Sequence, residues 1–101
     1  MTGAARPPSA EVARRLCYIM HYAWIEARNA AHDRDRIFDL ADVMEYAALL
    51  LRNYTEPHIS IAREGLANYR AKHSGHYDYR DMFDNGVPDD SSWLWLSRNV
   101  P

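Results

Sequence analysis

The sequence predicts an all-α fold, a three-helix up-down bundle with a short helical or extended C-terminal segment packed across it. Apolar residues recur at helical spacing in two long stretches, 16–31 and 37–54. A narrower stripe with the same period follows in 59–69. Capping and stop residues separate these stretches, and the short connections favour antiparallel neighbours.

Length and composition indicate one domain with one core. The chain has 101 residues, of which 48% are hydrophobic and 26% are charged. These proportions are typical of a globular protein and argue against wholesale disorder. Residues 1–9 contain small residues and two prolines, so we expect an N-terminal arm followed by a single helical domain over 10–101.

The first helix is expected over 10–31, with Ser9 as its N-cap. Leu16, Ile19 and Trp24 belong to one broad apolar face of this helix. A second apolar cluster lies on the opposite side and consists of Tyr18, Tyr22 and Ile25. Helix 1 therefore needs cover on two sides.

Two further helices are expected over 35–54 and 56–73. The first of these has the cleanest amphipathic pattern in the chain, and Thr55-Glu56-Pro57 is typical of a new helix start. Gly65 costs the third helix about 1 kcal/mol relative to Ala, unless it allows close approach of a neighbouring backbone. Ser74-Gly75 is typical of a helix end.

The last quarter of the chain predicts a short helix over 78–84 and a possible turn over 90–97. Asp78 can cap the short helix and Asn85-Gly86 can end it. Trp93-Leu94-Trp95-Leu96 is too short to assign by periodicity, but so much apolar surface favours packing on the bundle or on a partner.

The aromatic and arginine content of helix 1 favours protein–protein association. Tyr18, Tyr22 and Ile25, with Arg14 and Arg15 beside them, have the composition of interface hot spots. Trp93 and Trp95 are the other expected contact residues. The alternative is that the helix expected over 56–73 and the segment 93–96 cover this face within the same chain. We favour the interpretation in which this face contacts another molecule, either a protein partner or a second copy of the chain. A dimer is the first expectation.

His73, His76 and Asp78 form the densest group of potential metal ligands. Their spacing matches no structural zinc site, and a solvated helix end is the simpler interpretation. Asp39, Asp42 and Glu45 recur every three residues, but no Glu-x-x-His pair accompanies them, so we interpret them as a solvated face. No metal or cofactor is expected.

Enzyme chemistry has no motif to support it. The sequence contains no Gly-x-Ser-x-Gly and no phosphate-binding glycine loop, so we expect no catalytic residues. A nucleic-acid-associated regulator is a second hypothesis, in which the N-terminal arginines contact phosphates while Tyr18 and Tyr22 stack on bases. The net charge of −2 and the acidic Glu11 and Glu26 disfavour it.

Localisation follows from what the sequence contains. The longest uncharged stretch, Leu16 to Ile25, is too short for a membrane span, and no disulfide can form from the single Cys17. We therefore expect a small cytoplasmic, non-enzymatic interaction or regulatory protein. Its alternatives are the nucleic-acid-associated regulator and a metal-binding protein with a site at His73, His76 and Asp78.

Overall fold

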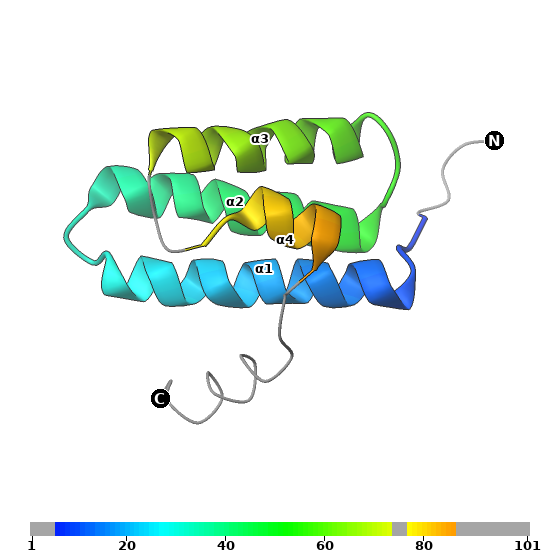
Figure 1. Cartoon of the computed structure of the whole chain (residues 1–101), viewed down its shortest axis with the longest axis horizontal. Coiled ribbons are helices and arrows are strands. Elements are labelled where there is room, and N and C mark those ends of the chain that lie inside the picture. The colour runs from blue at the N-terminus through cyan, green and yellow to red at the C-terminus, as the bar shows by residue number, and fades with distance from the viewer. Residues whose placement is uncertain (1–5, 74–76, 87–101) are drawn as a thin grey trace, which may run out of the picture.

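The computed structural model describes residues 6–73 and 77–86, which form four α-helices and contain no strand (Figure 1). The helices are α1 (Ala10–Asn29), α2 (Arg34–Arg52), α3 (His58–Lys72) and α4 (Tyr79–Asn85). The all-α prediction is confirmed. None of the helices in these residues is long and apolar enough to cross a membrane.

The four helices alternate in direction and pack around a common centre (Figure 1). α2 packs against α1 and α3, and α4 packs against the same two helices from the other side. The diagonal pairs, α1 with α3 and α2 with α4, make no close backbone contact in the described residues. The predicted three-helix bundle is therefore completed by α4, which is the described part of the predicted cross-packing segment; residues 90–97 lie outside the described residues.

Side-chain caps begin three of the helices. Ser9 Oγ accepts a hydrogen bond from the Val12 amide, and Asp33 and Asp78 do the same for the amides of Arg36 and Asp81. α3 has no such cap and starts two residues later than the sequence predicts. Its first turn is instead held by Glu56, whose Oε1 accepts from the amide and the hydroxyl of Ser60 at 3.0 and 2.7 Å.

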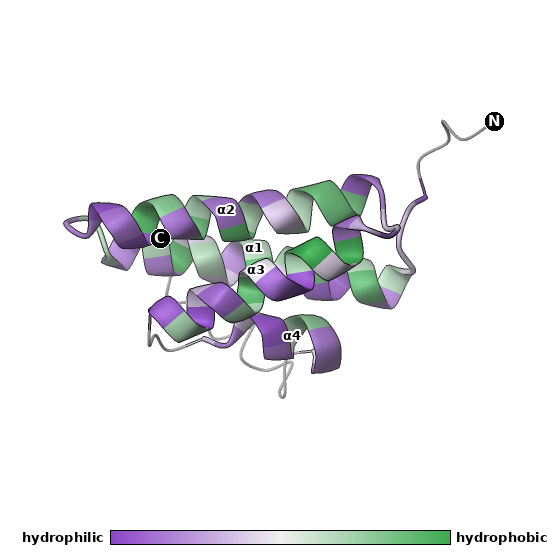
Figure 2. Cartoon of the chain, turned by 90° about the horizontal axis from the view of Figure 1, so that it is seen from above, coloured by the Kyte–Doolittle hydropathy of each residue, from purple (hydrophilic) through white to green (hydrophobic). Residues whose placement is uncertain are grey.

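The core runs along the centre of the four helices, and its largest fully buried side chain is Tyr79 of α4. Leu16 and Ile19 come from α1, and Leu40 and Leu50 come from α2. The hydropathy colouring shows how green residues interrupt the purple surface of each helix (Figure 2). α1 is thus covered on one side by α2 and on the other by α4, which explains why its sequence is apolar on two faces.

Gly65 allows α3 to lie close to a side chain of α2. A Cβ added at Gly65 would come within 2.3 Å of Cε2 of Tyr46, much closer than atoms can approach. The neighbour is therefore an aromatic ring and not the backbone that the sequence suggested. Gly65 lowers the helix propensity of α3, but it leaves room for the ring of Tyr46.

We predict that the effect of Gly65→Ala changes sign with the residue at position 46. In the wild type, overpacking of about 1–3 kcal/mol outweighs the roughly 1 kcal/mol gain in helix propensity, so the free energy of unfolding falls. In a Tyr46→Ala background the space is open and the same substitution stabilises by about 1 kcal/mol. Urea denaturation of the four proteins measures this coupling, and equal effects in both backgrounds would contradict it.

Candidate functional site

The face of α1 that the sequence assigned to a partner is buried within the chain. Tyr18, Tyr22 and Ile25 are 9%, 4% and 8% exposed. The centre of the Tyr22 ring lies 4.7 Å from the centre of the ring of Tyr77, a residue just before α4. The interpretation in which this face is covered internally therefore describes the folded chain, and these side chains offer little surface to another molecule.

Arg15 and Arg14 have different surroundings. Arg15 Nη1 donates to the backbone carbonyls of Phe83 and Asp84, at 3.4 and 3.0 Å, so its charge stabilises the C-terminal end of α4. Arg14 is exposed, with its guanidinium carbon 5.9 Å from the centre of the Tyr18 ring. The other two expected contact residues, Trp93 and Trp95, lie outside the described residues.

The structure engages two of the three potential metal ligands separately. His73 is buried, and its Nε2 lies 2.6 Å from Oδ2 of Asp39. Asp78 caps α4 through the Asp81 amide. His76 lies outside the described residues, and within 6–73 and 77–86 no three His, Cys, Asp or Glu side chains are grouped as metal ligands.

A buried carboxylate, that of Glu26 on α1, joins all four helices. Its side chain is 7% exposed. Arg36 of α2 donates to Oε2 at 2.7 Å, and Tyr69 of α3 also donates to Oε2. Tyr79 of α4 donates to Oε1 at 2.5 Å. Charge-assisted hydrogen bonds of this kind offset the cost of removing a carboxylate from water.

The protonation of the Glu26 cluster follows from its burial. Burial raises the pKa of the Tyr69 and Tyr79 hydroxyls, and the hydrogen bond to Glu26 raises both further. The pKa of Arg36 is also raised, chiefly by its hydrogen bond to Glu26. Both tyrosines therefore remain neutral donors. Because three side chains from three other helices donate to Glu26, the cluster is suited to holding the helices together.

A second polar cluster joins the N-terminal part of α2 to the C-terminal end of α3. Asp39 accepts from Lys72 Nζ at 3.0 Å as well as lying against His73. Beside it is a shallow groove of about 140 Å³ between the two helices, lined by Asp39, Asp42, Tyr46, Gly65, Asn68, Tyr69 and Lys72. His73 and then Lys72 hold the pKa of the Asp39 carboxyl below its ordinary value.

Exposed apolar side chains gather on the outer side of the α1–α2 hairpin. Trp24 of α1 is 42% exposed and Phe38 of α2 is 71% exposed. The Glu26–Arg36 ion pair fixes the register of the two antiparallel helices and places Trp24 and Phe38 near the same level. Partly buried and exposed apolar residues continue along the seam. We call this surface the hairpin face; it consists of Met20, Trp24, Ile37, Phe38, Ala41 and Met44.

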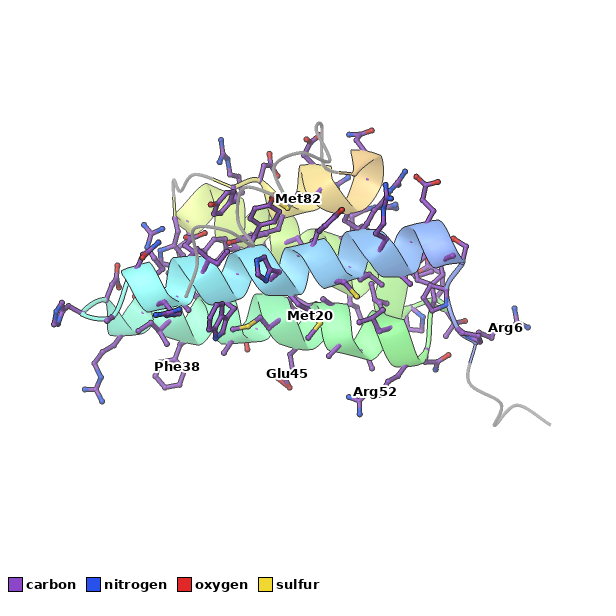
Figure 3. All side chains as sticks on the ribbon, turned by 90° about the horizontal axis from the view of Figure 1, so that it is seen from below. Arg6, Met20, Phe38, Glu45, Arg52 and Met82 are labelled. Carbon is purple, nitrogen blue, oxygen red and sulfur yellow. The ribbon has the colours of Figure 1, made fainter. Side chains whose placement is uncertain are left out.

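Figure 3 shows the hairpin face from the side of α1 and α2. Met20 lies at the boundary between the two helices, and Phe38 points away from the bundle at the outer edge of α2. Trp24 is held between two neighbours, with the guanidinium of Arg28 4.8 Å from its ring centre and the His21 ring stacked at 6.4 Å. Its indole is therefore exposed and oriented.

Sequence reasoning assigned Trp24 to the core and Glu26 to the surface, and the structure reverses both assignments. The two positions lie about 200° apart around a helix, on nearly opposite sides, so burying Glu26 turns Trp24 towards solvent. The available signal was Tyr69 and Tyr79 in the expected third and fourth helices. Buried hydroxyls need an acceptor, and a carboxylate on α1 can supply one.

Comparisons with protein-family models, with curated proteins and with solved structures found no match to this chain.

We predict that removing the Glu26 carboxylate alone is more damaging than removing it together with the two tyrosine hydroxyls that donate to it. Glu26→Leu leaves two buried hydroxyls and a guanidinium without their acceptor, a loss of about 3–5 kcal/mol in the free energy of unfolding. Combining Glu26→Leu with Tyr69→Phe and Tyr79→Phe removes the two stranded hydroxyls and recovers part of that loss. Urea denaturation compares the variants, and a triple variant no more stable than Glu26→Leu would contradict the prediction.

The Asp39 cluster predicts a specific pH dependence of stability. The folded-state pKa of Asp39 lies below the ordinary value of 3.8, so its contribution is present above pH 3.8 and is lost as the pH falls through the folded-state pKa. The free-energy difference between the wild type and Asp39→Asn should shrink as the pH falls below 3.8. Asp42→Asn is the control, because Asp42 is exposed and its side chain has no ion pair among the described residues. A difference for Asp39→Asn that does not change with pH would count against the prediction.

Proposed function

We propose that this protein is a non-enzymatic interaction module that binds a protein partner through the hairpin face. The observation that carries the proposal is the exposure of Trp24 and Phe38 at one level of the hairpin, beside a seam of further apolar side chains. Large exposed apolar patches are typical of binding surfaces. Aromatic, Met and Arg side chains are the types enriched at protein interfaces.

The orientation of Trp24 supports this proposal. A side chain already held by Arg28 and His21 loses little conformational freedom when a partner covers it. The methionines beside it, Met20 and Met44, are flexible and adapt to different apolar surfaces. The hairpin face thus combines an oriented aromatic anchor with adaptable surroundings.

Ile61 provides a comparison within the same chain. It is 53% exposed on α3, between Ser60 and Ala62, and lies outside the hairpin face. Single exposed apolar residues are common on protein surfaces and need no partner. We therefore use position 61 as the matched control for positions 24 and 38.

Position-specific crosslinking tests the proposed function. A photoreactive amino acid is placed at position 24, 38 or 61 of the full chain, and the chain is expressed in the cells that naturally produce it. We expect crosslinks to protein from positions 24 and 38 that exceed those from position 61, because the partner covers the hairpin face. Mass spectrometry identifies the crosslinked chain.

Equal crosslinking from all three positions, or none from positions 24 and 38, would overturn the proposal. A preliminary check is circular dichroism of each variant, which must retain the helicity of the wild type. Because Trp24 and Phe38 are exposed, their replacement leaves the core intact.

A further inference from the structure

We infer that the element which binds the hairpin face is an amphipathic helix with acidic flanks. This inference rests on the proposed function and names the chemistry of the partner. It draws on the charges that surround the hairpin face, on the absence of a strand edge in the described residues, and on the way two copies of the face would meet.

The arginines that border the hairpin face differ from those beside α4. Arg28, Arg34 and Arg52 are exposed, and none has an ion pair in the described part of the chain. By contrast, the arginines beside α4 have a carboxylate partner: Arg63 and Arg80 both pair with Asp84, at 3.0 and 2.9 Å.

Helical periodicity places Arg34 and Arg52 on the same outer stripe of α2 as Phe38, with Glu45 between them (Figure 3). Arg28 lies against Trp24 on α1, at the end of the hairpin that also carries Arg34. Asp42, one turn after Phe38, is also exposed and adds a second carboxylate beside Glu45. Three arginines against these two acids still leave a net positive border on a chain whose overall charge is −2. An acidic partner complements this border.

The apolar part of the surface favours a helix as the partner's element. The described residues contain no strand, so they offer no sheet edge for an extended peptide to join. Two antiparallel helices instead present a seam, along which a third helix can place residues spaced at i, i+3, i+4 and i+7. Trp24, Met20 and Met44 are the side chains that such a helix would cover.

A second copy of the chain fits this surface poorly. One end of the hairpin face carries Arg28 and Arg34, and the other end carries Arg52. If two copies meet face to face in either direction, arginine is brought opposite arginine. Like charges placed against one another oppose association, whereas carboxylates at the same positions favour it.

Binding of designed peptides to the full chain tests this inference. The probes are helical peptides of about 18 residues with leucines at i, i+3, i+4 and i+7. One peptide carries Glu at its flanking positions, a second carries Lys there, and a third carries Glu but has its leucines replaced by Ser. We expect the acidic amphipathic peptide to bind at least about tenfold more tightly than the lysine peptide, with binding that weakens as salt increases. The serine peptide should not bind.

Matched variants locate the binding. Trp24→Ser combined with Phe38→Ser should abolish binding of the acidic peptide, while Ile61→Ser should leave it unchanged. Arg28→Glu combined with Arg34→Glu should reverse the preference, so that the lysine peptide binds more tightly. Circular dichroism and thermal denaturation confirm that each variant is folded.

The outcomes separate this inference from the proposed function. Equal binding of both charged peptides, or no peptide binding while positions 24 and 38 still crosslink to protein, overturns the acidic helix alone. Crosslinking of positions 24 and 38 to a second copy of the chain also overturns it. If a single-stranded oligonucleotide displaces the acidic peptide and binds more tightly, the hairpin face is a nucleic-acid site and both proposals fail.

Discussion

The carboxylate of Glu26 is the point on which the arrangement of the four helices depends. One buried charge accepts hydrogen bonds from Arg36, Tyr69 and Tyr79, so α1 is tied to each of the other three helices at a single place. A carboxylate in the core is costly unless its oxygens are satisfied. Any shift of α3 or α4 that broke one of these bonds would leave a polar group stranded, and this penalty favours one relative placement of the helices over others.

This constraint also explains how the tyrosines of the chain are used. Tyr69 and Tyr79 bury their rings in the core and donate their hydroxyl groups to Glu26, whereas the ring of Tyr46 lies in the space that Gly65 leaves. Each ring supplies apolar area together with a polar group that must find a partner. The seven-residue helix α4 also buries Met82 and Phe83. Arg15 at its C-terminal carbonyls and Asp84 with its two arginines supply further contacts.

With α1 covered by α2 on one side and α4 on the other, its remaining surface is the outer stripe that carries Trp24 and Arg28. The structure thus moves the candidate interface from one side of α1 to another. The charges around α4 and those beside the hairpin face also differ. Around α4 the charges are paired within the fold, while the arginines beside the hairpin face are available to a partner, as the proposed recognition of an acidic helix requires.

The all-α class and the positions of the caps at Ser9, Asp33 and Asp78 follow from local sequence, because hydrophobic periodicity and capping act over a few neighbouring residues. The need of α1 for cover on two sides was also readable from its sequence alone. Only the tertiary structure decided which residues provide that cover. It buried Tyr18 and Tyr22, brought two tyrosines from distant helices to Glu26, and left Trp24 in solvent. These outcomes depend on contacts between residues as many as 53 positions apart, and helical periodicity carries no information about which distant side chain will meet a given face.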